Sequence, residues 1–209
     1  MSKRVSAIAC VIILLPTIAF GNGKFQIDGD VLVYDTEVVE VEADAEITTE
    51  DPDQLLRLLR ENPDITRVHL NSGGGGYYAG LEMGRIIADF ELHTHVVDEC
   101  SSSCTYVFAG GLSRSMSRGA KVGFHHTSWS PSSMEEYYEE EREGAGWNTP
   151  FDFASWSYRD TQQEIYDELK FLMSRGISAE FALETIRVRR EGLWYPTRRE
   201  LFEAGYLTE

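Results

Sequence analysis

Asn71-Ser72-Gly73-Gly74-Gly75-Gly76 opens a stretch of this sequence that continues through Cys100-Ser101-Ser102-Ser103-Cys104 and closes with His125-His126. Together these segments hold the parts that an acyl-transfer site needs: backbone amides free to bind an oxyanion, a nucleophile and a base. Each segment taken alone is weak evidence for chemistry. Their succession within one stretch makes an acyl-transfer site the first hypothesis for this chain.

Apolar segments alternate with helical patterns around these three segments. Short strands are indicated at 68–70, 92–97 and 120–125, and helices at 79–90 and 103–109. Strands that alternate with helices predict an α/β fold of parallel β-α units, with ligand sites at the carboxyl ends of the strands. All three candidate segments fall at such ends.

The flanking sequence continues the mixed pattern. Alternating apolar residues around Asp28-Gly29 predict a β-hairpin over 25–34. The remaining expected elements are a β segment at 38–47, a leucine-rich helix ended by Asn62-Pro63, helices at 153–175 and 178–189, a short capped helix after Pro196 and a final β segment. Between them, residues 129–150 carry an acidic run at 135–143, which is typical of a solvated loop or fraying helix. A lid or an oligomer contact is the alternative role for that run.

The N-terminus predicts export. Lys3 and Arg4 precede an apolar run over 5–20, and Ala19-Phe20-Gly21 has small residues at the spacing that a signal peptidase prefers. The run is shorter than the roughly 20 apolar residues of a membrane span, so an uncleaved anchor is the minority alternative. We expect a signal peptide at 1–21, a single domain at 22–209, no stable membrane anchor after cleavage, and a periplasmic or secreted protein.

The net charge of the chain limits the classes of partner that it can bind. Residues 1–21 hold two of the 19 basic residues and none of the 35 acidic ones, so their removal leaves a net charge of −18. Such an acidic surface repels phosphate backbones and anionic lipids, which argues against nucleic-acid partners. No spacing of cysteine and histidine matches a metal site, and we expect neither a metal nor a cofactor.

Cys100 and Cys104 are the cysteines that remain after signal cleavage. In an exported chain they could form a disulfide, because a spacing of four on a helix brings their Cα atoms to about 6 Å. Two small buried thiols beside a tight turn are the alternative.

Several of these residues resemble the Clp-type serine peptidases. The segment from Asn71 to Gly76, followed by Ala79-Gly80, is similar to their Asn-Ser-Pro-Gly-Gly…Ala-Gly segment, and Ser101–Cys104 with Phe108–Gly111 is similar to their nucleophile helix. Residues 121–125 resemble the strand of the family's catalytic histidine, and 200–206 resemble its closing segment. The resemblance spans residues 46–209. It implies a crotonase-like spiral of β-β-α units with a protruding helical segment, in an exported branch distinct from the cytoplasmic peptidase.

The resemblance places the nucleophile at Ser102 and one oxyanion amide at Gly75. A serine at the start of a helix has unpaired amides beside it and a favourable helix dipole, so the amide of Ser103 is the second expected donor. A glycine such as Gly75 lets a substrate approach the backbone closely. Ser102 still requires a base, because a serine hydroxyl is a poor nucleophile unless its proton is removed.

The strand pleat selects His125 as the base. Val122, Phe124 and His126 share one face of the strand, which the two apolar residues place in the core, so His125 points the other way. The resemblance fails at the third member, since the family's aspartate position falls on Leu193. The nearest acid, Glu191, could orient the imidazole or could be a surface glutamate, which leaves open a serine-histidine dyad or an inactive site.

Two classes of function follow. The first is an exported serine hydrolase, a peptidase without an ATP-driven unfoldase, that acts on peptide or protein substrates. The second is a catalytically silent binding or assembly module of the same fold. A crotonase-type acyl-CoA enzyme is a distant third, because an exported acidic chain would rarely meet that polyanionic cofactor. Since relatives dock through a helical handle, the resemblance also implies a homo-oligomer, trimer or larger.

Overall fold

The computed structural model describes residues 23–38, 45–189 and 192–209. Their strands form a six-stranded sheet in the order β1-β2-β3-β4-β5, with β6 also paired to β4. β1 and β2 are antiparallel, and all other pairs are parallel. The strands are β1 Phe25–Asp28, β2 Val31–Asp35, β3 Arg67–Ser72, β4 His93–Ser101, β5 Arg114–Met116 and β6 Lys121–Gly123. The predicted α/β class and the β1-β2 hairpin are therefore confirmed.

The parallel register brings the ends of β3 and β4 together. Ser72, the last residue of β3, pairs with Cys100 near the end of β4, after a register shift that follows Leu70. β6 then pairs with the same end of β4, where Ser101 lies opposite Gly123. The glycine segment, the serine cluster and the histidine segment leave the sheet at one edge for this reason.

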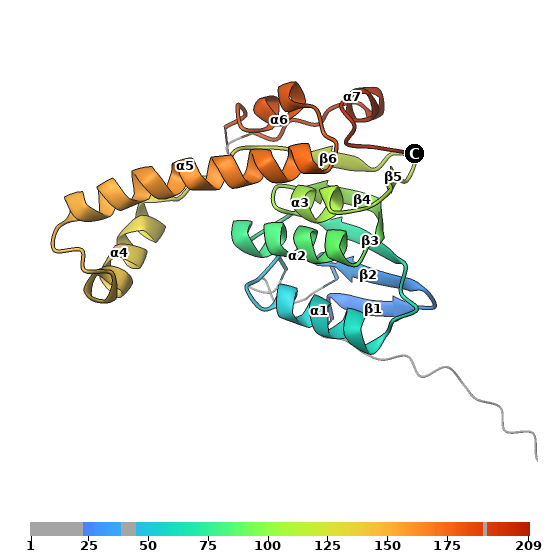
Figure 1. Ribbon diagram of the computed structural model, residues 1–209, viewed down its shortest axis with the longest axis horizontal. Helices are drawn as coiled ribbons and strands as arrows, with labels where there is room; N and C mark the ends of the chain where they lie inside the picture. The colour runs from blue at the N-terminus through green and yellow to red at the C-terminus, as the bar shows by residue number, and fades with distance from the viewer. Residues whose placement is uncertain (1–22, 39–44, 190–191) are drawn as a thin grey trace, which may run out of the picture.

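Three helices follow the strands and lie side by side along the sheet (Figure 1). They are α1 Asp51–Glu61, α2 Tyr77–Asp89 and α3 Cys104–Ala109. α2 approaches the start of α3 closely, since a Cβ placed on Gly80 would lie 2.6 Å from the carbonyl oxygen of Ser103. The absence of a side chain at Gly80 thus lets the helix after the glycine loop pack directly on the serine turn.

A buried ion pair fixes the start of α1. Lys24 Nζ lies 2.9 Å from Asp51 Oδ2, and the same oxygen accepts hydrogen bonds from the Tyr34 hydroxyl at 2.6 Å and the Thr48 amide at 2.9 Å. Burial, together with the charge of Asp51, raises the pKa of Tyr34. A buried carboxylate is tolerated here because its oxygen is paired and hydrogen-bonded.

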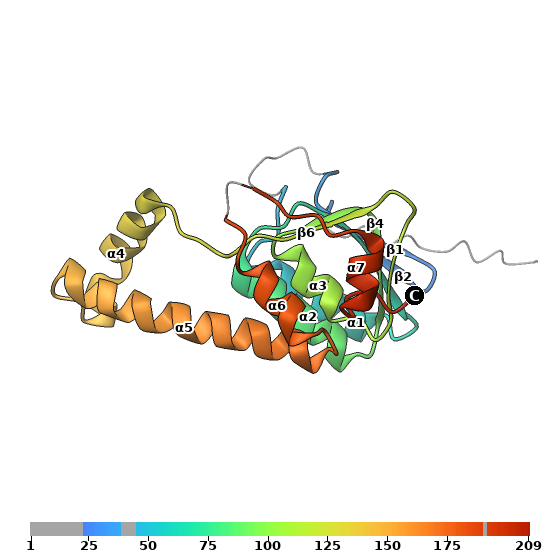
Figure 2. The same ribbon diagram turned by 90° about the horizontal axis from the view of Figure 1, so that it is seen from above.

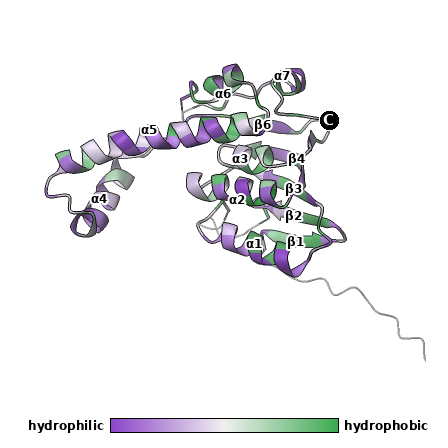
Figure 3. Ribbon diagram, in the orientation of Figure 1, coloured by the Kyte–Doolittle hydropathy of each residue, from purple (hydrophilic) through white to green (hydrophobic). Residues whose placement is uncertain are grey.

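α4 Pro131–Ala145 and α5 Pro150–Ser174 extend to one side of the sheet in both views (Figures 1 and 2). The acidic run at 135–143 is helical and lies within α4, which Figure 3 colours mainly as hydrophilic. Stacked and tilted rings join the two helices at their far end, namely Tyr137, Trp147, Phe153 and Trp156. These rings give the projecting pair a small core of its own.

The C-terminal segment returns to the sheet through α6 Ala179–Thr185 and α7 Arg198–Glu203. Thr197 and Glu200 form a capping box that starts α7. The expected final β segment is wrong: residues 206–209 form no strand, although the amide of Thr208 donates to the carbonyl of Arg114 at 3.0 Å. Of the β segment expected at 38–47, residues 39–44 lie outside the described residues, and Ile47 forms an isolated bridge with Gly75.

Candidate active site

Ser102 lies in the tight turn between β4 and α3 and has a positive φ of 55°. Its amide donates to the carbonyl of Gly123 at 2.9 Å, and its carbonyl accepts from the Thr105 amide at 3.0 Å and hydroxyl at 2.6 Å. A residue other than glycine is costly in this left-handed region, and such strain is concentrated at functional sites. The helix itself begins at Cys104 with Ser103 as its N-cap, so Ser102 precedes the helix instead of starting it.

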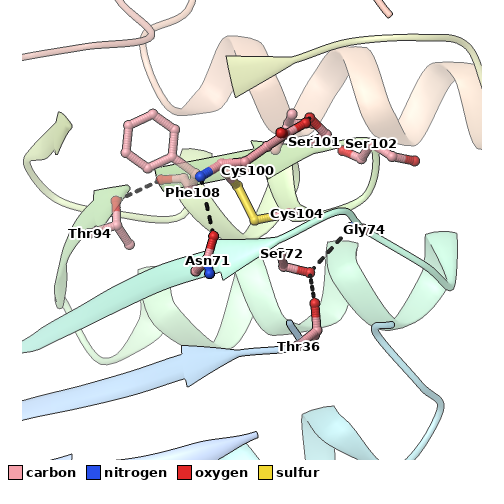
Figure 4. The surroundings of a disulfide bond; sticks show 12 residues. Thr36, Asn71, Ser72, Gly74, Thr94, Cys100, Ser101, Ser102, Cys104 and Phe108 are labelled. Atoms are coloured by element: carbon pink, nitrogen blue, oxygen red, sulfur yellow. Dashed lines mark hydrogen bonds between the residues drawn. A yellow bond between two sulfur atoms is a disulfide. The ribbon is translucent and has the colours of Figure 1, made fainter. Parts of the chain in front are cut away.

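Cys100 and Cys104 flank this turn and are joined by a disulfide, with their Cα atoms 5.2 Å apart (Figure 4). Cys100 belongs to β4 and Cys104 is the first residue of α3, so the bond ties the end of the strand to the start of the helix. Both residues are fully buried. The disulfide therefore closes a short loop whose middle residue is Ser102.

The glycine loop between β3 and α2 lies directly against the serine turn. Gly74 has a φ of 106°, and a Cβ placed on it would lie 2.6 Å from the Cβ of Ser102. Its amide donates to Ser72 Oγ at 3.2 Å, which in turn accepts from the Thr36 hydroxyl at 3.0 Å (Figure 4). These bonds hold the loop in a conformation that only glycine adopts easily.

Two backbone amides beside Ser102 are available for an oxyanion. Within the described part of the chain, the amides of Gly75 and Ser103 donate no backbone or side-chain hydrogen bond, whereas the amides on either side of Gly75 do. The bridge to Ile47 uses the carbonyl of Gly74 and the amide of Gly76, and so leaves the amide of Gly75 unpaired. Unpaired, fixed amides of this kind are what an oxyanion hole requires.

His125 faces the same cavity as Ser102, whereas its neighbour His126 is not among the cavity's lining residues. His125 Nδ1 lies 2.8 Å from the carbonyl oxygen of His126. A carbonyl only accepts hydrogen bonds, so Nδ1 carries the proton and the neutral ring has its lone pair on Nε2. The amide of His126 donates to Val188 at 2.7 Å, and Phe124 exchanges two backbone bonds of 2.9 Å with Trp194, which anchors this segment on both sides of His125.

Two features of a complete catalytic triad are not seen among the described residues: the acidic third member, and a hydrogen bond between the nucleophile and the base. Glu191 lies outside the described residues, so its expected role stays a prediction. Among the described side chains, Ser102 Oγ and the His125 ring form no direct hydrogen bond, although both line one cavity. Catalytic hydrogen bonds in unliganded sites are often long and shorten only when substrate binds.

The cavity that contains Ser102 and His125 has a volume of about 610 Å³. Its wall includes residues that the sequence motifs did not identify, and most of them are aromatic or acidic: Glu46, Tyr77, Tyr78, Tyr106, Trp129 and Glu164. Tyr77 and Tyr78 directly follow the glycines, so their position on the first turn of α2 is the signal that could have placed them at the site.

A buried acid lies behind this wall. Glu168 of α5 is buried, and burial raises the pKa of its carboxyl to about 7, while a hydrogen bond from Tyr106 opposes the rise. Burial also raises the pKa of Tyr106, as does the neighbouring charge of Glu168. Because Tyr106 is on α3, this hydrogen bond links α5 to the helix that follows Ser102.

The other histidines do not join the site. His93 and His95 are hydrogen-bonded on the sheet to Ser113, Ser115 and Ser117 at 2.8–2.9 Å, and the ring of His69 packs on that of His95. The described residues include no group of three or more His, Cys, Asp or Glu side chains that could hold a metal ion. Within the same residues, no helix is both long and apolar enough to cross a membrane.

Comparison with known proteins gives a likeness at the level of the fold. No family model matches the chain, and no curated protein matches its sequence. Among solved structures, a single-residue mutant of ClpP1 from Listeria monocytogenes superimposes with a TM-score of 0.51 at 16% sequence identity. The match covers 78% of this chain and 85% of that one. At this identity the likeness shows the fold alone, and the fold of this chain is similar to that of the Clp proteases.

Proposed function

We propose that this chain is an exported serine hydrolase, specifically a peptidase that acts without ATP. The observation that carries the proposal is the placement of Ser102 in a strained turn, in one cavity with His125 and beside the unpaired amides of Gly75 and Ser103. The Clp-like fold supports a peptidase, because the neighbour described above is a Clp protease.

In the proposed reaction, Ser102 Oγ attacks the peptide carbonyl carbon while His125 Nε2 accepts the hydroxyl proton. The new C–O bond moves the carbonyl π electrons onto oxygen, where the amides of Gly75 and Ser103 donate hydrogen bonds to the charge that develops. Collapse breaks the C–N bond, and His125 returns its proton to the leaving amine. Water, deprotonated by His125, then attacks the acyl carbon and forms a new C–O bond. The ester bond to Ser102 Oγ breaks, and His125 returns its proton to that oxygen, which releases the acid and free Ser102.

We favour a Ser102-His125 dyad. An acid in a catalytic triad fixes the tautomer of the histidine, and here the carbonyl of His126 accepts from Nδ1 in that place. A carbonyl carries no full charge, so it stabilises the imidazolium less than a carboxylate does. The dyad therefore predicts a slower enzyme than a complete triad, and Glu191 is dispensable in this scheme.

The remaining parts of the proposal concern location and assembly. Residues 1–21 would direct export, and ATP is not expected outside the cytoplasm. The β-α units would belong to a spiral of the crotonase type, from which α4 and α5 protrude to dock further copies in a closed homo-oligomer of three or more. The aromatic Phe151, with 84% of its surface exposed on α5, is available for such a contact.

One observation favours the second candidate function, a silent binding or assembly module. Ser102 and His125 share a cavity without a hydrogen bond between them in the described residues. If the pair never closes onto a substrate, the fold would retain its surfaces for binding and lose its chemistry.

A fluorophosphonate probe separates the two functions. The purified mature chain is incubated with the probe, and the modified residue is located by mass spectrometry. Label on Ser102 that disappears in Ser102→Ala and His125→Ala supports the hydrolase. Ser101→Ala is the matched control, because Ser101 is buried and donates to Glu99 at 2.6 Å, away from the cavity lining. A folded chain that takes no label supports the silent module.

A further inference from the structure

The cavity beside Ser102 is negatively charged and aromatic. Its acidic lining residues are Glu46 and Glu164, and its described lining includes no lysine or arginine. Four aromatic residues, Tyr77, Tyr78, Tyr106 and Trp129, also line it, together with glycines and several serine and threonine residues. A cavity of this composition differs from an apolar pocket, because its acids require a cation or water to balance them.

Glu164 is one of the two acids in this lining. It is half-buried on α5, and no ion pair links it to a basic residue in the described part of the chain. Burial raises the pKa of its carboxyl, the charge of Asp160 adds to the rise, and a hydrogen bond from Tyr78 opposes it. Asp160 also accepts from the Tyr78 hydroxyl at 3.5 Å, so the neighbouring groups are acidic as well.

Ser103, another residue of the cavity lining, has a buried hydroxyl. Ser103 Oγ is buried and has no hydrogen-bond partner among the described residues, while the residue is only 2% exposed.

We propose that this cavity is a specificity pocket for a cationic side chain, so that the enzyme prefers peptides with arginine or lysine next to the cleaved bond. The inference rests on the function proposed above, and it names the substrate class of the same site. A guanidinium or ammonium group pairs with Glu164, and the faces of tyrosine and tryptophan attract the same cation.

The same wall discriminates against other side chains. An acidic side chain would face Glu46 and Glu164 and be repelled, and an apolar one would cover Glu164 without pairing it. The net charge of −16 on the whole chain adds a long-range field that draws cationic peptides toward the surface. Glu164 therefore acts as a specificity-determining residue that takes no part in the bond-breaking steps.

The pocket is tested by binding, without any need for catalysis. Isothermal titration of Ser102→Ala with benzamidine and with the neutral benzamide compares a cation with a molecule of nearly the same shape. We expect benzamidine to bind about 10–100-fold more tightly, as one charged hydrogen-bonded pair contributes, and Glu164→Gln in the same background to remove the difference. Glu61→Gln, which removes the same charge from an exposed site on α1, must leave it intact.

Equal binding of the two molecules to Ser102→Ala would overturn the inference, even if Glu164→Gln failed to fold. Paired fluorophosphonates, one alkyl and one bearing a guanidinium, separate this inference from the proposed function in the unmodified chain. Label on Ser102 without preference for the guanidinium probe overturns the cationic pocket and leaves the hydrolase standing. Preferential binding of benzamidine with no label from either probe supports the pocket and overturns the hydrolase.

Discussion

Gly74 and Ser102 face each other so closely that a Cβ on Gly74 would lie 2.6 Å from the Cβ of Ser102. The same atom would lie 2.7 Å from the carbonyl oxygen of Ser101 and 3.1 Å from the amide nitrogen of Ser103. The glycine loop thus packs against the backbone that aims the candidate nucleophile and one oxyanion donor. A side chain at position 74 has to displace that backbone.

Gly74→Ala should therefore impair both stability and chemistry. The methyl group meets backbone atoms that cannot rotate away, and alanine is strained at a φ of 106°, so we expect a loss of at least about 2 kcal/mol in the free energy of unfolding. Labelling of Ser102 should fall about 100-fold, because a shift of about 1 Å is enough for that loss. Urea denaturation and labelling kinetics measure the two effects.

Gly144→Ala is the matched control for this substitution. Gly144 lies in α4, where a Cβ would have nothing within 4 Å and alanine favours the helix. It should unfold no more easily than the wild type. If Ser102 were labelled as fast in Gly74→Ala as in the wild type, the serine turn would not depend on this contact.

Local patterns predicted the part of the fold that carries the site. The apolar segments before Gly73 and before Ser102 form β3 and β4, and the helical periodicity after each glycine or serine cluster forms α2 and α3. Because parallel strands place their carboxyl ends at one edge, the sequence predicted that the glycine, serine and histidine segments lie together, and the resemblance to Clp-type peptidases implied Ser102 and Gly75 within them, beside Ser103 and His125. The cavity contains all four residues.

Long-range contacts account for what the sequence did not predict. β5 has three residues and no periodicity of its own, and it exists because it pairs with β4. The C-terminal segment was expected to be a final β segment, but it packs around Arg114 instead of pairing in the sheet. Residues such as Glu46 and Glu164 come from segments that are distant in the sequence, and no local spacing records that they share a cavity with Ser102.

Arg114 should be a major determinant of stability. It is 3% exposed, and its guanidinium donates to the carbonyls of Gly111, Arg175, Gly205 and Tyr206 at 2.7–3.0 Å. Arg114→Met would leave these carbonyls without their donor, at a cost of about 3 kcal/mol or more. Urea denaturation measures the loss.

Arg85→Met tests whether the loss of stability in Arg114→Met arises because Arg114 is buried. Arg85 is exposed, and its ion pair with Glu82 has a distance of 3.6 Å. An exposed pair contributes less than about 1 kcal/mol, so this variant should remain close to wild type. Equal losses in the two variants would contradict the role assigned to Arg114.

Glu168 should make the fold less stable as the pH rises. Its pKa is about 7 in the folded chain against an ordinary value of 4.5, so the folded state holds the proton more tightly than the unfolded chain. Its contribution is complete below pH 4.5 and is lost as the pH rises through about 7, a change of about 3 kcal/mol. The facing groups are Tyr106, Tyr77 and Glu164.

Denaturation curves between pH 5 and pH 8 measure this dependence. Glu168→Gln keeps a carbonyl that accepts from Tyr106 and has no proton to lose, so its stability should change less over the range. Glu61→Gln, on the exposed side of α1, should retain the wild-type slope. If the stability of Glu168→Gln changed with pH as steeply as that of the wild type, Glu168 would not be the group responsible.

The exposed stripe on α5 should mediate assembly. Phe151 and Tyr158 are 84% and 73% exposed, and with Ile165 they recur every seven residues along one side of the helix. We expect light scattering to show a trimer or larger assembly, and Phe151→Glu with Tyr158→Glu to dissociate it. Gln163→Glu, which adds a charge on another side of α5, should leave the assembly intact. A wild-type monomer at all concentrations would contradict the prediction.

The disulfide between Cys100 and Cys104 should affect chemistry more than stability. It ties β4 to α3 around Ser102, so its loss frees the turn that aims the hydroxyl and the Ser103 amide, and labelling should slow by up to about 100-fold. A loop this short contributes only about 2 kcal/mol on chain-entropy grounds. Because both cysteines are buried, the dithiol form is prepared by reducing the unfolded chain and refolding it with reductant. In the double variant Cys100→Ala, Cys104→Ala, reductant must not change labelling. Equal labelling of the disulfide and dithiol forms would show that the bond does not position Ser102.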